Sequence, residues 1–151
     1  MARWSGGTFS LGSGEVVDGS ISSSTKIDAD KLQHIFRHGT NFDLAIGGTP
    51  ATLEEIVWVA TTAGTIRGVH ALLNDTGTTT DIDFECKKNG TTVLSAAINF
   101  THADGDKAVK DGTVSVTTFV ADDIISLGMT VTTSTGAQGP YAWIDVEENA
   151  S

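Results

Sequence analysis

This sequence has one cysteine, few basic residues and no long apolar run, and each scarcity excludes a class of protein. Because Cys86 is the single cysteine of the 151 residues, no disulfide can form within the chain. Lysine and arginine total 9 against 19 aspartates and glutamates, giving a formal charge of −10. Phosphate backbones and anionic lipid surfaces repel such a chain, so we expect neither nucleic acid nor a membrane as a partner.

Apolar stretches are short throughout the sequence. None approaches the roughly eighteen consecutive apolar residues of a membrane-spanning helix, and the start, MARWSGGTFSLGSGEVVDG, lacks the apolar core of a secretion signal. We therefore expect a protein that is made in the cytoplasm and is soluble there. Its length suits one domain with an appendage, and such a domain needs no metal or disulfide to hold it together.

The clearest local pattern is DIDFECKKNGTTVL at 81–94. Strand side chains alternate between two faces, so Ile82, Phe84 and Cys86 share one face while acidic residues and Lys87 occupy the other. Asn-Gly supplies the positive φ angles of a tight hairpin turn. The pattern predicts a hairpin with one buried face, in which the Cys86 thiol is buried and unreactive.

Similar short apolar stretches recur from residue 54 onward, separated by glycine, asparagine and aspartate. They read EEIVWVATT, GTIRGVHALLN, DIDFECKK, TTVLSAAINF, TVSVTTFV, DIISLGMTVTT and PYAWIDVE. Short β-branched runs at this spacing, with no long helix between them, are typical of an antiparallel β-sandwich of the jelly-roll type. We predict that residues 51–151 form this sandwich.

Residues 1–50 have a different composition, with many glycines and serines before residue 25. We interpret this part as an extended arm followed by one short amphipathic helix over 28–38, with Asp28 as N-cap and Gly39 at its end. Isolated large apolar side chains in a glycine-rich arm are costly to leave in water, so we expect them to dock on a partner. The candidate docking residues are Trp4, Phe9, Leu11, Val17 and Ile21.

Candidate metal and catalytic groups are weak. His102-Ala-Asp-Gly-Asp at 102–106 resembles part of a calcium loop but lacks the bidentate glutamate, which favours a solvated turn. His34 and His38 have helical spacing without the glutamate of a zinc protease. Tyr141, Arg67 and His70 are the residues that could begin an enzyme site, and nothing in their spacing makes them converge. We predict no catalytic residue, no cofactor and no metal site.

Aromatic residues leave a second interpretation open. Trp4, Trp58, Trp143 and Tyr141 could form a platform on which a sugar stacks. Trp58 and Trp143 lie within apolar strand patterns, which favours a core position for both. Exposed aromatic rings would instead indicate a receptor-binding or glycan-binding module.

Two segments resemble virion proteins of tailed phages. The opening GTFSLGSGEVVDGSISSSTKIDADKLQHIF is similar to a pattern near the start of many such proteins, and GTIRGVHALLNDTGTTTDIDFECKKNGTTVLS with FVADDIISLGMTV resembles a β-sandwich module of phage surface proteins. Gly12 replaces the proline usual after Ser-Leu, and Asp28-Ala29-Asp30-Lys31 replaces an asparagine-rich helix start.

The resemblance implies a structural protein of the virion. An arm followed by a small sandwich suits a decoration (cement) protein on the capsid surface, bound to the major capsid protein as a homotrimer, better than a fibre with a long shaft. A head-fibre or tail-fibre module that binds a receptor or glycan is the alternative. Neither implies enzymatic activity.

Overall fold

The structure is a computed structural model and describes residues 35–148. This part of the chain consists of β-strands and one short 3-10 helix. The elements are β1 (Ile35–Thr40), β2 (Leu53–Val59), β3 (Gly64–Asp75), β4 (Thr79–Lys88), β5 (Thr91–Thr92), β6 (Ile98–Thr101), η2 (His102–Asp104), β7 (Lys110–Gly112), β8 (Thr118–Phe119), β9 (Ile124–Thr135) and β10 (Gln138–Glu148). The prediction of an all-β protein with antiparallel sheets is confirmed. No helix of the described residues is long and apolar enough to cross a membrane.

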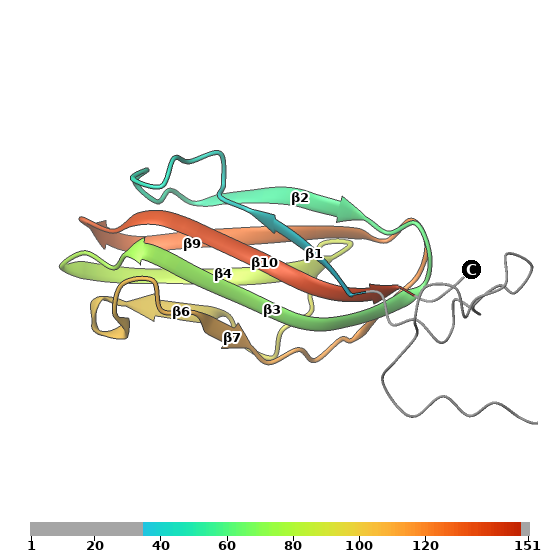
Figure 1. The fold of residues 1–151 in the computed structure, drawn as a ribbon. Coiled ribbons are helices and arrows are strands. Elements are labelled where there is room, and N and C mark those ends of the chain that lie inside the picture. The colour runs from blue at the N-terminus through green and yellow to red at the C-terminus, as the bar shows by residue number, and fades with distance from the viewer. Residues whose placement is uncertain (1–34, 149–151) are drawn as a thin grey trace, which may run out of the picture. The chain divides into compact units, whose positions relative to one another are not determined.

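The strands form two antiparallel sheets (Figure 1). Sheet A has the order β1-β10-β3-β7, with β8 also paired to β3, and sheet B has the order β2-β9-β4-β5, with β6 also paired to β4. β1 pairs with β10, β2 with β9, β3 with β7 and β8, and β4 with β5 and β6. The pairs are therefore nested from the two ends of the described chain toward its middle, as in a long hairpin that has been folded into two sheets.

The inner faces of both sheets contribute to a single core. Strands β3 and β10 of sheet A supply Val69, Leu73 and Ile144, while β4 and β9 of sheet B supply Phe84 and Leu127, and all of these are buried. Phe84 lies 5.6 Å from the Phe100 ring centroid in an edge-to-face contact. Because apolar side chains alternate with polar ones along each strand, the apolar side chains of both sheets form one layer between them.

The 81–94 hairpin forms as the sequence predicts. Asn89 and Gly90 both have positive φ, 51° and 80°, and the turn pairs Lys88 with Thr91. The Asn89 carboxamide also donates to the Asp123 carboxylate at 2.6 Å and accepts from the Ile124 N–H at 2.8 Å. The turn therefore fixes the start of β9 as well as the hairpin.

The predicted helix over 28–38 is wrong in its described part, because Ile35–Thr40 is strand β1. β1 pairs with β10 over its whole length, from Ile35 with Glu147 to Thr40 with Ala142. A helix this short is only marginally stable in water, whereas pairing with β10 stabilises the extended backbone of these residues. Tertiary pairing therefore overrides the weak local preference for a helix. Strand β1 pairs with the sheet and Gly48 bonds to Gly139, although our sequence-based prediction assigns residues 1–50 to the extended arm and short helix.

Cys86 lies on β4 with its side chain fully buried, which confirms the predicted buried thiol. Burial raises the pKa of the thiol from 9.0 to about 12. Above pH 9 the thiol therefore loses its proton in the unfolded chain but keeps it in the folded protein. The stability that comes from burying the neutral thiol is complete below pH 9 and is lost as the pH rises toward 12.

Between pH 8 and pH 10 we expect the free energy of unfolding to fall by about 1.4 kcal/mol more in the natural chain than in Cys86→Ala. The variant lacks the thiol but keeps every lysine and tyrosine, so the difference between the two curves isolates Cys86. Urea unfolding at each pH measures it. Parallel curves would contradict the assigned burial of the thiol.

Candidate functional site

Aromatic and charged side chains cover the outer face of sheet A. Trp143 on β10 is only 7% exposed, because the Arg37 guanidinium lies 5.0 Å from the centre of its ring and His70 stacks at 5.1 Å. Tyr141 lies two residues before it on the same face, 5.5 Å away between ring centroids. Trp143 therefore lies outside the common core, yet it offers no open ring face to a ligand.

Asp145 links the two side chains that cover Trp143. Arg37 donates two hydrogen bonds to it, at 2.8 and 2.9 Å, and the His70 Nε2 atom lies 3.4 Å away. The Arg37 hydrogen bonds hold the pKa of Asp145 below its ordinary value. The His70 Nδ1 atom lies 2.7 Å from Asp111 on β7, so both ring nitrogens of this histidine have carboxylate neighbours. The cluster spans four strands and stabilises the outer face.

Next to this cluster lies a groove of about 520 Å³, which we call the Tyr141 groove. Its floor is made by β3 and β10, and its wall by the segment between β1 and β2. The lining residues are Gly39, Thr40, Asn41, Leu44, Ala45, Ile46, Leu72, Asn74, Gly139, Pro140 and Tyr141. None of them carries a charge, although the whole chain has a formal charge of −10.

Close backbone packing holds the groove in shape. The Gly139 N–H donates to the Gly48 carbonyl oxygen at 2.9 Å, which ties the wall to the floor. A side chain at Gly39 would come within 2.6 Å of the Tyr141 hydroxyl oxygen, so the absence of a Cβ there lets the tyrosine lie across β1. The Asn41 carboxamide donates to the Leu44 carbonyl oxygen at 2.7 Å and closes the turn of the wall.

A second feature is the concentration of exposed apolar side chains on β1 and β2, the edge strands on one side of the two sheets. We call this the β1–β2 edge, defined by Ile35, Phe36, Leu53, Ile56 and Val59. Ile56 is 66% exposed and Val59 is 47% exposed. Val59 pairs with Ile124 of β9, which is also exposed. Edge strands with exposed apolar residues favour pairing with another polypeptide.

The two edge strands are held together by side chains. The His38 ring stacks on Trp58 with centroids 4.8 Å apart, and the Thr40 hydroxyl donates to the Glu55 carboxylate. Trp58 also contacts Phe119 edge to face, which confirms its predicted packing on the core. Burial of His38 lowers the pKa of its imidazole. The β1–β2 edge is therefore a formed surface rather than two separate strands.

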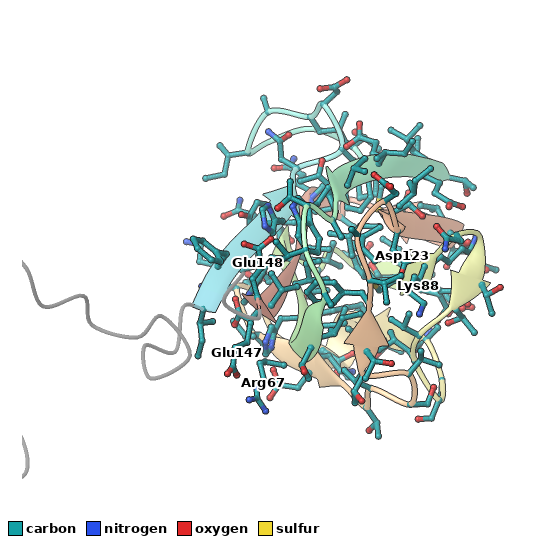
Figure 2. The ribbon with its side chains drawn as sticks, turned by 90° about the vertical axis from the view of Figure 1, so that its right-hand side faces the viewer. Arg67, Lys88, Asp123, Glu147 and Glu148 are labelled. Carbon is teal, nitrogen blue, oxygen red and sulfur yellow. The ribbon has the colours of Figure 1, made fainter. Side chains whose placement is uncertain are left out.

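The predicted docking residues Trp4, Phe9, Leu11, Val17 and Ile21 lie outside the described residues. Of the three residues that could begin an enzyme site, Tyr141 and His70 both contact Trp143, whereas Arg67 donates to Glu147 at 2.5 Å. Figure 2 shows Arg67 beside Glu147 at the end of the sheets. The structure thus brings two of the three together and places the third in a separate ion pair.

The carboxylates of the 102–106 segment turn to different partners. Asp104 accepts from Lys110 at 2.7 Å and from the Thr101 N–H at 2.6 Å, and these two hydrogen bonds lower its pKa. Asp106 accepts from the Thr76 N–H at 2.9 Å. Among residues 35–148, no group of three or more histidine, cysteine or acidic side chains is placed to hold a metal ion. Both aspartates act as turn-forming groups.

Asp123 is one of the few buried charged residues, although it lies in the turn just before β9. Its carboxylate accepts from the Val120 N–H at 2.9 Å and from Asn89 at 2.6 Å, and Lys88 lies 3.6 Å away (Figure 2). These hydrogen bonds hold the pKa of Asp123 below its ordinary value. Val120 is a local partner, but Asn89 and Lys88 come from the turn between β4 and β5, which no pattern around Asp122-Asp123 indicates.

Sequence reasoning missed most of the Tyr141 groove. The alternation in PYAWIDVE places Tyr141 and Trp143 on one face, and this is what the structure shows. The wall at 41–46 lies in a segment that the sequence interpretation left without a role. No pattern in that segment could reveal that it folds against β10.

Comparison with known proteins finds no family model that matches the chain and no curated protein that matches it.

Proposed function

We propose that this chain is a non-enzymatic structural protein of a phage virion, which binds the outer surface of the capsid as a decoration (cement) protein. The observation that carries the proposal is the β1–β2 edge, where large apolar side chains are exposed on two adjacent edge strands. The resemblance of the sequence to tailed-phage proteins supplies the identity of the partner, the major capsid protein. The topology, with paired strands nested from the chain ends inward, supports a jelly-roll body.

The proposed mechanism is adhesion without turnover. The segment before Ile35 carries the apolar residues of the arm and continues directly into β1, so arm and edge would contact the same partner. Burying one such side chain contributes about 1.5–3 kcal/mol before ordering costs. The resemblance to decoration proteins is the basis on which we propose a homotrimer, in which three linked contacts of this size would bind far more firmly than one.

Substitution of one edge residue tests the proposal. We expect Val59→Asp to weaken co-sedimentation with capsid shells assembled without the protein by more than tenfold, because the contact would bury an unpaired carboxylate. Val109→Asp is the matched control, since Val109 is 53% exposed but lies next to β7, at the opposite edge of sheet A from β1. Deleting residues 1–25 should also abolish sedimentation while leaving the sheets folded. Equal binding by both aspartate variants, or retained binding after the deletion, would contradict the proposal.

The Tyr141 groove favours a second candidate function, a receptor-binding or glycan-binding module of a head or tail fibre. Its volume falls within the usual range of ligand sites, and an exposed tyrosine lies in its lining. A screen of the full chain on a glycan array tests this candidate. An array without hits would leave capsid attachment as the sole proposal.

A further inference from the structure

We propose that the Tyr141 groove binds a neutral saccharide. The inference deepens the second proposed function, rests on the groove alone and does not depend on attachment to a capsid. It assigns a ligand class from three properties of the lining: its lack of charge, its unpaired polar groups and its aromatic side chain.

The lack of charge in the groove lining disfavours ionic ligands. The lining contains no acidic or basic side chain. Arg37, on the neighbouring strand β1, donates two hydrogen bonds to Asp145, and this carboxylate offsets its positive charge. The protein as a whole is strongly acidic, so an anion would also be repelled at longer range. A cation would find no carboxylate in the lining, and the favoured ligand is therefore uncharged.

Unpaired polar groups then exclude a purely apolar ligand. Within residues 35–148, no side-chain hydrogen bond is formed by the Asn74 carboxamide or by the Tyr141 hydroxyl, and both side chains line the groove. The Asn41 carboxamide uses its N–H on Leu44 and leaves its oxygen available. A hydrocarbon ligand would cover these groups without hydrogen-bonding them, which is costly. A ligand with several hydroxyls would satisfy both donors and acceptors.

The remaining lining suits the apolar side of a sugar ring. Tyr141 is 36% exposed and lies on the floor of the groove, while Leu44, Leu72 and Pro140 supply aliphatic surface. A saccharide combines a face of C–H groups with a rim of hydroxyls, which matches an aromatic ring beside carboxamides. The backbone contacts of Gly39 and Gly139 form this shape in advance, so little ordering opposes binding.

The test uses the full chain and a glycan array containing neutral glucose, galactose, mannose and N-acetylglucosamine oligomers together with sialylated and uronic-acid glycans. Hits are titrated by saturation-transfer NMR and calorimetry. We expect saturable binding of at least one neutral saccharide, more than tenfold weaker in Tyr141→Ala and in Asn74→Ala. Tyr141→Phe keeps the ring and should lose less affinity than Tyr141→Ala. Circular dichroism and the thermal midpoint establish that each variant is folded.

Three results would overturn the inference: no neutral saccharide binds, only acidic glycans bind, or binding survives both Tyr141→Ala and Asn74→Ala. Val59→Asp separates this site from the capsid proposal, because it alters the β1–β2 edge and leaves the groove lining intact. Saccharide binding that persists in Val59→Asp, with shell binding lost, supports both proposals. A chain that binds shells and no saccharide retains the first and overturns the second.

Discussion

Replacing Phe84 by alanine is expected to lower the free energy of unfolding by about 3–5 kcal/mol. Phe84 lies on β4 and is 1% exposed, with Phe42 and Phe100 at ring-centroid distances of 5.9 and 5.6 Å. Removing the ring loses its transfer from water and leaves a cavity that the rigid sheets can close only in part. Urea unfolding, followed by circular dichroism, measures the loss.

Phe36→Ala provides the comparison for this effect. Phe36 is on the edge strand β1 and is 43% exposed, so truncation removes less buried surface, and we expect less than half of the loss seen for Phe84. The same variant belongs to the β1–β2 edge and should weaken shell binding, which Phe84→Ala should affect only through unfolding. Equal losses of stability would contradict the assignment of β1 as an exposed edge.

The hairpin at 81–94 shows how much of the fold local sequence can specify. Period-two alternation placed Ile82, Phe84 and Cys86 on one face, and all three are buried. Asn-Gly correctly predicted both the position and the type of the turn, since both residues have positive φ. Such signals are local because turn geometry and side-chain alternation depend only on neighbouring residues. They determine which residues are strands and which face is buried.

Pairing between distant segments is what the sequence could not show. Ile35 and Phe36 have helical spacing with Leu32, and this predicted a helix, but β1 pairs with β10 and Arg37 bonds to Asp145 across more than a hundred residues. Strand order in each sheet is decided in the same way. Its determinants are contacts between segments far apart in the chain, and their identity cannot be read from either segment alone.

At both candidate sites, local sequence predicts the strand, but contacts with other strands decide which residues are exposed. Apolar residues in EEIVWVATT predicted a strand, but only the sheet order makes it an edge, so that Ile56 and Val59 are exposed. Tyr141 was predicted on one face with Trp143, yet its exposure depends on Arg37 and His70 covering the tryptophan instead. Both candidate sites therefore consist of residues whose local sequence pattern is ordinary and whose surroundings come from other strands.

Replacing Gly139 by alanine is expected to cost about 2–5 kcal/mol of folding stability, as the sum of two effects. Gly139 has φ of +60°, a conformation that L side chains rarely adopt, and a Cβ there would collide with the Ile46 carbonyl oxygen and lie 2.7 Å from the Asn74 Cβ. Relief of this collision requires the wall at 46–48 to move away from β10. The Tyr141 groove would then lose its shape together with its tie to Gly48.

Gly136→Ala separates these two effects. Gly136 has φ of +79°, but its nearest contact for an added Cβ is 3.5 Å away, so alanine there carries the backbone cost of about 1–2 kcal/mol without the collision. Urea unfolding of both variants measures the difference, and saccharide titration shows whether only Gly139→Ala also loses the ligand. Equal losses of stability in Gly139→Ala and Gly136→Ala would mean that the wall moves aside at little energetic cost. A groove with so mobile a wall could not select a ligand by shape.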